Sequence, residues 1–141
     1  MTRQWATLAA ASSLACGGVD ATPVELQGTN WALVELAGEP VTPGGEPGAG
    51  YLRFEAGADR RFGASVGCNG MGGRWNSDGE ALGFSEVMST LMACDAVVMS
   101  RERQLTEALA TTSTYRVAGN RLELLAGDRV LAAFVADSTP R

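Results

Sequence analysis

The stretch "SVGCNGMGGRW", residues 65–75, decides how the whole chain is interpreted, because it holds four glycines, one cysteine and an Asn-Gly pair. It fits three structures: a phosphate-binding loop, a reactive thiol site, or a corner between two strands. A phosphate loop places its backbone N–H groups at the start of a helix and usually supplies a Lys. Here the glycines lead into Arg-Trp-Asn-Ser-Asp-Gly, which is typical of a strand and a hairpin turn. The sequence therefore disfavours phosphate binding.

The N-terminus is typical of an export signal. Arg3 supplies a positive charge, and the apolar run of eleven residues that follows is too short to span a bilayer. Small residues then lead to Cys16, a pattern that resembles a bacterial lipobox. We expect a signal peptide over residues 1–15, acylation of Cys16 after cleavage, and a flexible tether over residues 16–27. The alternatives are ordinary cleavage after Ala11 and a cytosolic start with a disordered tail.

This signal predicts a location. Acyl chains on Cys16 would hold the protein firmly on a membrane, since each buried methylene adds about 0.8 kcal/mol. Gly17 follows where an acidic residue would resemble an inner-membrane retention signal. We therefore expect an outer-membrane lipoprotein that faces the periplasm. A soluble periplasmic or secreted protein is the alternative.

The remaining two cysteines raise the thiol question. Cys94 stands just before a predicted helix, where a thiol can become reactive. Cys68 is available to pair with it, and in an oxidising envelope two such thiols most simply form one disulfide. On the chain-entropy account this bridge would stabilise the fold by roughly 3–4 kcal/mol. Asn69 and Gly70 suit a corner that needs a positive φ, or an Asn side chain that bonds to the backbone.

Most of the chain predicts short antiparallel strands separated by turns. Alternating apolar residues, or β-leaning runs between turn residues, predict strands within residues 29–36, 51–56, 60–66, 72–84, 85–94 and 113–137. Asp78-Gly79, Gly119-Asn120 and Gly127-Asp128 are tight-turn signals within these segments.

One segment, residues 95–111, predicts a helix because it has no Gly or Pro and many helix formers. Asp95 can cap its first turn. Its apolar face is formed by Val98, Leu105, Ala108 and Leu109. The expected fold is therefore mostly β: a small antiparallel roll or barrel-like sheet of about eight strands, with one covering α-helix, over residues 28–137.

Composition excludes several functions. The chain has no histidine, so a Ser-His-Asp or Cys-His catalytic site is impossible, and no CxxC pair offers a zinc site. The net charge of −5 and the lack of a basic run argue against nucleic-acid binding. We expect no catalytic residues, no metal and no cofactor. The length of 141 residues suits one domain, and we expect a monomer.

These motifs together resemble the META/HslJ-like domain family. The family pattern is a Gly-Cys-Asn corner, a strand with Gly and an aromatic residue, Ser-Thr-x-Met-Ala-Cys, a helix with a Glu, and a hydrophobic C-terminal hairpin. The residues that match this pattern are Gly67, Cys68, Asn69, Gly70, Met92, Ala93, Cys94 and Glu102. The chain departs from the family at Asp95, where Pro is common. The resemblance implies a small β roll with one helix, in a secreted or lipid-anchored envelope protein associated with heat shock, antibiotic tolerance or motility.

Two binding functions follow. The first is a non-catalytic, envelope-anchored domain that is stress-associated or binds an unknown protein or envelope component. The second is a carrier of a lipid or small hydrophobic ligand inside the roll. Four methionines could line such a cavity or simply fill gaps in the core, which is the commoner role: Met71, Met88, Met92 and Met99.

A carboxylate enzyme is the remaining alternative. Glu86, Glu102 and Glu107 are its candidate residues, since paired carboxylates can hydrolyse glycosides. However, Glu102 and Glu107 are five residues apart on the predicted helix and would face different sides. Trp31 and Trp75 could stack on a sugar or peptide, although such residues more often belong to the core.

Overall fold

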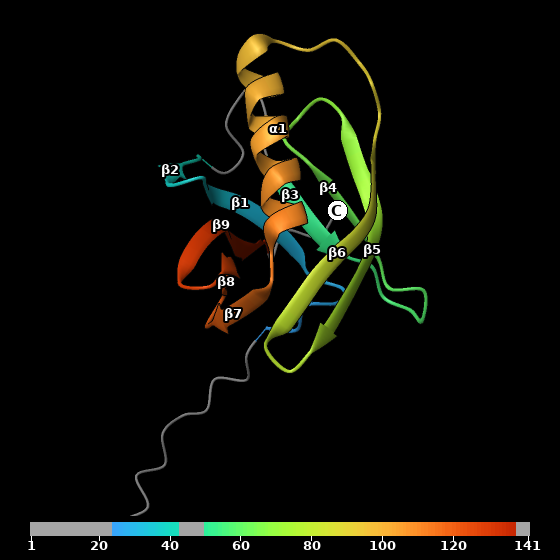
Figure 1. The fold of residues 1–141 in the computed structure, drawn as a ribbon, viewed down its shortest axis with the longest axis vertical. Helices are drawn as coiled ribbons and strands as arrows, with labels where there is room; N and C mark the ends of the chain where they lie inside the picture. The colour runs from blue at the N-terminus through green and yellow to red at the C-terminus, as the bar shows by residue number, and fades with distance from the viewer. Residues whose placement is uncertain (1–23, 43–49, 138–141) are drawn as a thin grey trace, which may run out of the picture.

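The fold is a ring of antiparallel strands with one helix packed against it (Figure 1), seen in a computed structural model that describes residues 24–42 and 50–137. Within these residues there are nine strands and one helix. Their bounds are β1 Asn30–Leu36, β2 Glu39–Pro40, β3 Tyr51–Phe54, β4 Arg61–Ser65, β5 Gly70–Asp78, β6 Ala81–Ser89, α1 Ala96–Thr111, β7 Thr114–Ala118, β8 Arg121–Ala126 and β9 Arg129–Asp137.

The ring closes because β1 pairs on both of its edges. On one edge it pairs with β3 and, near its end, with β2. On the other edge it pairs with β9, the last strand of the chain. The strands from β3 to β9 follow one another in sequence order, each antiparallel to the next. This confirms the expected barrel-like sheet.

The strand β1 shows how the core is built. Trp31 and Leu33 point inward as the alternation predicts, but Leu36 is also buried while Glu35 is half-buried and pairs with Arg121. The register against β9 shifts between Leu33 and Glu35. A bulge of this kind moves the following side chains to the opposite face. The bulge therefore explains why the expected alternation fails at the end of the strand.

Large apolar side chains fill the interior of the ring. The fully buried ones include Trp31, Leu33, Leu52, Phe54, Leu122, Leu124 and Phe134. Phe54 meets Trp75 edge to face at 5.2 Å, and Phe62 meets Phe84 in the same way at 5.0 Å between ring centroids. Because these side chains contact one another closely, the centre of the barrel is a packed core.

The helix α1 covers the weakest seam of the ring. β6 and β7 share one residue pair, Ala81 with Thr114, and α1 packs against β6 beside this seam (Figure 1). Asp95 caps the helix by accepting from the Val97 N–H at 2.9 Å. The four predicted apolar positions, Val98, Leu105, Ala108 and Leu109, are all buried. The predicted helix and its buried face are thus confirmed.

Gly73 permits a second bulge, between β5 and β6. The register shifts between Gly72 and Arg74, and Glu86 on the facing strand has a φ of 53°. A Cβ atom on Gly73 would lie 2.6 Å from the carbonyl oxygen of Ser85. Glycine is therefore required here by close approach of the facing backbone.

Three details differ from the sequence prediction. The short strand β2 was not expected. β6 continues unbroken to Ser89, and residues 90–94, which we expected to be extended, form a loop. The segment 24–27, expected to belong to the tether, packs on the domain: Val24 and Leu26 contact the core, and the Leu26 carbonyl accepts from the Trp31 indole at 3.3 Å.

Some predictions lie outside the described residues. They are the signal peptide over residues 1–15, the lipidation of Cys16 and the first part of the tether. Among the residues that the structure does describe, no helix has the length and apolar character needed to cross a bilayer.

Candidate functional site: the Gly-Cys-Asn corner

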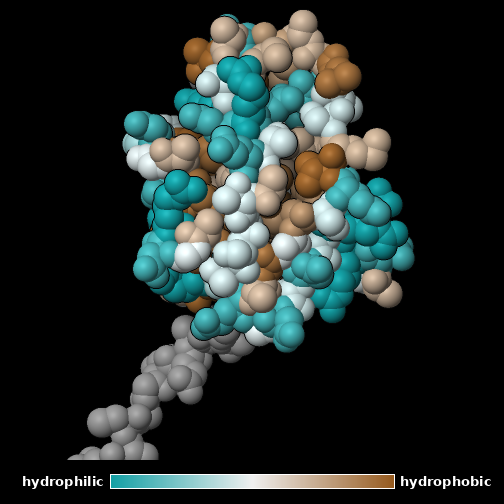
Figure 2. All heavy atoms as spheres, in the orientation of Figure 1, coloured by the Kyte–Doolittle hydropathy of each residue, from teal (hydrophilic) through white to brown (hydrophobic). Residues whose placement is uncertain are grey.

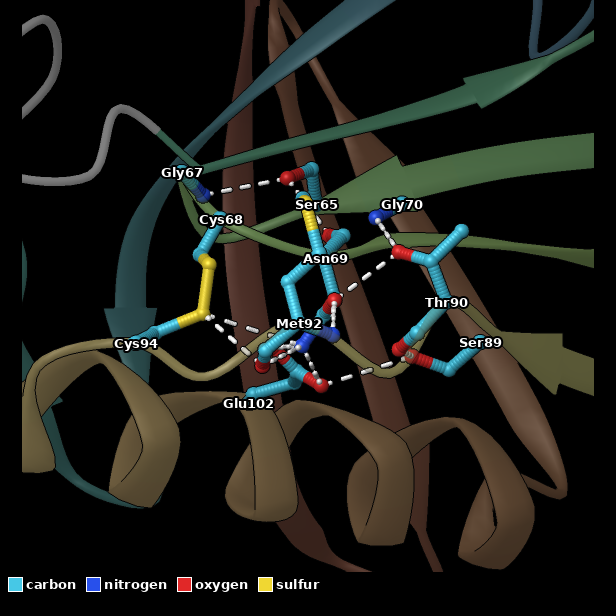
Figure 3. Close-up of a disulfide and its surroundings, with 10 residues drawn as sticks. All are labelled: Ser65, Gly67, Cys68, Asn69, Gly70, Ser89, Thr90, Met92, Cys94 and Glu102. Atoms are coloured by element: carbon cyan, nitrogen blue, oxygen red, sulfur yellow. Dashed lines mark hydrogen bonds between the residues drawn. A yellow bond between two sulfur atoms is a disulfide. The ribbon is translucent and has the colours of Figure 1, made fainter.

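The motif at residues 65–70 forms a tight corner between β4 and β5 (Figure 3). The Ser65 hydroxyl donates to the Asn69 carbonyl at 2.9 Å and accepts from the Gly67 N–H at 3.0 Å. Gly67 has a φ of 109°. We expected the positive φ at Asn69 or Gly70, but neither residue has one. This local bonding turns the chain and directs the Asn69 side chain inward, where it is 2% exposed.

The Asn69 carboxamide fixes the loop that follows β6. Its oxygen accepts from the Met92 N–H at 2.7 Å and from the Thr90 hydroxyl at 2.9 Å. Its nitrogen donates to the Met92 carbonyl at 3.2 Å. Asn69 therefore completes the backbone hydrogen bonds of Met92 as a neighbouring strand would, although residues 90–94 are not in a strand.

The same carboxamide reaches the helix. The Asn69 nitrogen lies 3.0 Å from both carboxylate oxygens of Glu102, and the Ser89 hydroxyl donates to this carboxylate at 3.3 Å. Bonds to a carboxylate are stronger than those between neutral groups. One buried side chain thus ties together the β4–β5 corner, the β6–α1 loop and α1.

The disulfide joins two of these segments, the β4–β5 corner and the β6–α1 loop. Cys68 and Cys94 are bonded, with their Cα atoms 6.3 Å apart (Figure 3), which agrees with the pairing predicted from the sequence. Neither sulfur is therefore a free, reactive thiol. The backbone argues against phosphate binding as well, because the N–H groups of Gly67 and Gly70 already donate to the hydroxyls of Ser65 and Thr90.

The corner is therefore a structural clamp. The family-motif residues Gly67, Asn69, Gly70, Met92 and Glu102 meet in it, while Ala93 is exposed in the loop that it holds. Ser65, Ser89 and Thr90 belong to the same network; Ser89 and Thr90 stand in the Ser-Thr-x-Met-Ala-Cys pattern but were not predicted as site residues, and neither was Ser65. The hydroxyl-rich run Ser89-Thr90 just before Leu91 was the signal that could have indicated them. Among the described residues, no three His, Cys, Asp or Glu side chains are grouped to hold a metal ion.

The clamp holds a loop that presents apolar side chains to solvent. We use the name apolar loop for residues 88–97, which comprise the end of β6, the loop that follows it and the start of α1. Its exposed side chains are Met88 (77%), Leu91 (97%), Met92 (55%) and Val97 (58%). Figure 2 shows hydrophobic residues gathered at the end of the molecule where this loop reaches the helix. Each of these large side chains would lower its free energy by leaving water.

The methionines do not line a common cavity. Met71 is buried in the core and Met99 is half-buried, whereas Met88 and Met92 face solvent. The prediction that all four line a cavity is thus wrong, and so is the prediction that all four fill core gaps.

The carboxylate candidates have separate surroundings. Glu86 is exposed and pairs with Arg74 at 3.0 Å, Glu102 belongs to the clamp, and Glu107 is exposed on α1. The two tryptophans considered for stacking are both in the core, since Trp31 is fully buried and Trp75 is 5% exposed.

Comparison with known proteins supports this architecture. No curated protein matches the chain. A protein from Burkholderia xenovorans solved by NMR has a TM-score of 0.66 at 19% identity, with 99% of this chain and 100% of that chain covered. A second NMR structure has a TM-score of 0.61 at 21% identity, over 78% of this chain and 91% of that one. The crystal structure of a DUF4847 family protein from Bacteroides vulgatus has a TM-score of 0.57 at 19% identity, over 87% and 100%.

At such identities these three structures establish the fold alone. The family assignment comes from the sequence model of the META domain, which matches residues 24–138. The match includes the whole Gly-Cys-Asn corner, the apolar loop and the helix. The chain therefore belongs to the META domain family.

Proposed function

We propose that this protein is a non-catalytic binding domain of the bacterial cell envelope, and that it docks on a protein partner through the apolar loop. The observation that carries this proposal is the exposure of four large apolar side chains, two on a loop that is clamped from two sides and one on each element that the loop joins. Scattered apolar residues are ordinary on a protein surface, but these four all lie within residues 88–97.

The clamp favours binding because it fixes the loop in advance. Asn69 bonds both backbone groups of Met92, and the disulfide attaches to the loop two residues later at Cys94. A loop that is already ordered loses little conformational entropy when it docks. Burial of each large apolar side chain would then contribute about 1.5–3 kcal/mol.

Two observations argue for this function over the alternatives. Each candidate carboxylate has different surroundings, and the chain contains no histidine, which supports a non-catalytic role. A carrier of a lipid or hydrophobic ligand would need space inside the roll, whereas Trp31, Phe54 and Phe134 lie fully buried there. Binding at the surface fits this packing better. The association with heat shock that the family resemblance implies stays a prediction.

The envelope location rests on Cys16, whose acylation would anchor the chain to a membrane. The described chain begins, in blue, at the end of the barrel away from the apolar loop (Figure 1). If Cys16 is anchored through the expected flexible tether, the loop would be free to reach a partner in the periplasm. The disulfide suits this oxidising compartment.

Site-specific photocrosslinking in cells tests the docking surface. A benzophenone side chain is placed at Leu91 in one variant and at the exposed Asp59 in a control. We expect a discrete protein adduct from position 91 and none from position 59. An adduct of twice the chain mass would identify a second copy as the partner, and adducts with lipid alone would contradict a protein partner. Equal labelling from both positions would also contradict the proposal.

Cell fractionation tests the anchor. The Cys16→Ser variant should leave the membrane fraction while the wild-type chain stays in it. If the variant remains membrane-bound, acylation of Cys16 is not the anchor. If both forms are soluble, a periplasmic or secreted protein is the better description.

A further inference from the structure

A cleft of about 910 Å³ opens at the opposite end of the barrel from the apolar loop. The two sites lie at the two ends of β6: the cleft is near its first residue, Ala81, and the apolar loop includes its last, Ser89. One wall of the cleft is β7, from Thr114 to Val117, and the segment 24–27 supplies further lining. The volume is within the range of sites that bind ligands.

The β7 wall carries an open strand edge. The Tyr115 N–H donates to the Glu80 carbonyl at 3.0 Å, on the side of β7 that faces β6. Past this bond the β5–β6 hairpin has turned at Gly79, and in the described part of the chain no strand pairs with this edge at Val117. Alternate residues of a strand direct their backbone groups to the same side. The N–H and C=O of Val117 therefore face the cleft.

This open edge differs from the rest of the β6–β7 seam, which α1 covers. A closed barrel removes strand edges, and proteins usually shield the ones that remain, because unpaired N–H and C=O groups are a template for another extended chain. The edge at Val117 is short and borders a cleft. It offers a donor and an acceptor for strand pairing.

The rim of the cleft is acidic. Glu25, Glu80 and Asp128 are exposed carboxylates in its lining. The lining also includes Arg116, but its guanidinium is paired with Glu123 on β8 at 2.9 Å. Charges on two partners are usually complementary at an interface. The rim therefore favours an occupant with basic side chains.

One lining residue, Trp75, keeps its polar atom buried beneath the cleft. Trp75 is 5% exposed, and its indole N–H is buried with no hydrogen-bond partner among the described residues. Buried polar groups without a partner are uncommon in folded proteins. The cleft thus offers an acidic rim and an open strand edge, with the buried Trp75 ring beneath its lining.

We propose that this cleft binds an extended, basic segment of another polypeptide, which adds to the edge of β7 as a further strand. Strand addition uses the main chain of the ligand for affinity and its side chains for specificity. The proposal is independent of the apolar loop, because the two sites lie at opposite ends of the barrel and use different contacts.

An NMR titration of the full-length chain tests it, with the acetylated and amidated peptide TKVRVKT as the probe. We expect the amide signals of Tyr115, Val117 and Gly119 to shift in a saturable way. A control peptide with N-methyl groups on alternate residues cannot form the strand hydrogen bonds and should bind about tenfold more weakly or not at all.

Two variants of the protein test the same hydrogen bonds from the protein side that the methylated peptide tests from the peptide side. Val117→Pro removes the N–H that faces the cleft but leaves the bonds to β8 intact, so we expect the fold to remain and the affinity to fall about tenfold. Val117→Thr keeps the N–H and should bind within about threefold of the wild type. If the proline variant does not fold, the methylated peptide still tests the pairing on the unchanged protein.

Three results would overturn the proposal. The first is the absence of any shift with the peptide at about 2 mM, a concentration that detects even weak complexes. The second is equal binding of the methylated and unmethylated peptides, which would indicate ionic attraction without strand pairing. The third is concentration-dependent shifts at Val117 without peptide, because a second copy of this chain would then occupy the edge.

Discussion

Replacement of Asn69 by Ala is the most direct test of the clamp. The substitution deletes two bonds with the Met92 backbone, one from the Thr90 hydroxyl and one to the Glu102 carboxylate. A neutral hydrogen bond contributes about 1 kcal/mol and one to a charged group about 1.5–3 kcal/mol. The gross loss is then about 4.5–6 kcal/mol.

Water would recover part of this loss. Thr90 and Met92 are exposed residues, so their freed groups can be hydrated, while Glu102 is less accessible. We therefore expect Asn69→Ala to lower the free energy of unfolding by about 2–4 kcal/mol, a large share of the 5–15 kcal/mol typical of a domain. The exposed Asn76 is the matched control, and Asn76→Ala should change stability by no more than about 0.5 kcal/mol.

Urea denaturation followed by circular dichroism, with the disulfide intact, measures both variants. A double-mutant cycle with Glu102→Gln then isolates the bond to the helix, for which we expect a coupling energy of about 0.5–3 kcal/mol. A loss below about 1 kcal/mol for Asn69→Ala would refute the reasoning, because the disulfide alone would then fix the corner.

Three further predictions concern the framework. Replacement of both Cys68 and Cys94 by Ala opens a loop of 26 residues, which should cost roughly 3.5 kcal/mol in a urea melt; an unchanged midpoint would contradict a structural bridge. Gly73→Ala should lower the melting temperature by several degrees because the added Cβ would collide with the backbone of the facing strand. Gly63→Ala is the control, since a Cβ there has open space and should not lower the melting temperature. Equal effects of the two substitutions would mean that the bulge is not at Gly73. Leu105→Ala should cost about 2–5 kcal/mol because this side chain is fully buried, and unchanged stability would mean that the helix packs differently.

Local features of the fold were well predicted from the sequence. The turns at Gly79, Gly119 and Gly127 each have a positive φ near 60°, as the tight-turn signals required. The helix begins directly after its expected cap at Asp95. These features depend on a few neighbouring residues, so a single sequence carries enough information to identify them.

Long-range features could not be predicted in this way. The pairing of β1 with β9 closes the barrel, yet nothing near Trp31 indicates that Ala136 lies beside it. The same limit applies to the clamp. The family resemblance indicated Asn69, but a carboxamide can bond within its own corner or across the fold, and only the structure shows that its partner is the backbone of Met92.

The two ends of β6 are stabilised very differently, and this difference favours separate roles for them. Beyond Ser89 a disulfide and the bonds of Asn69 hold the apolar loop in one conformation. At Ala81 one residue pair joins β6 to β7, and the edge of β7 beyond Tyr115 stays open. A fixed apolar surface suits a partner with a preformed groove, since neither side then loses much entropy on docking. An open edge instead suits a partner that becomes ordered only when its backbone pairs. If both sites are occupied, the domain could hold an extended segment at one end and dock on a folded protein at the other.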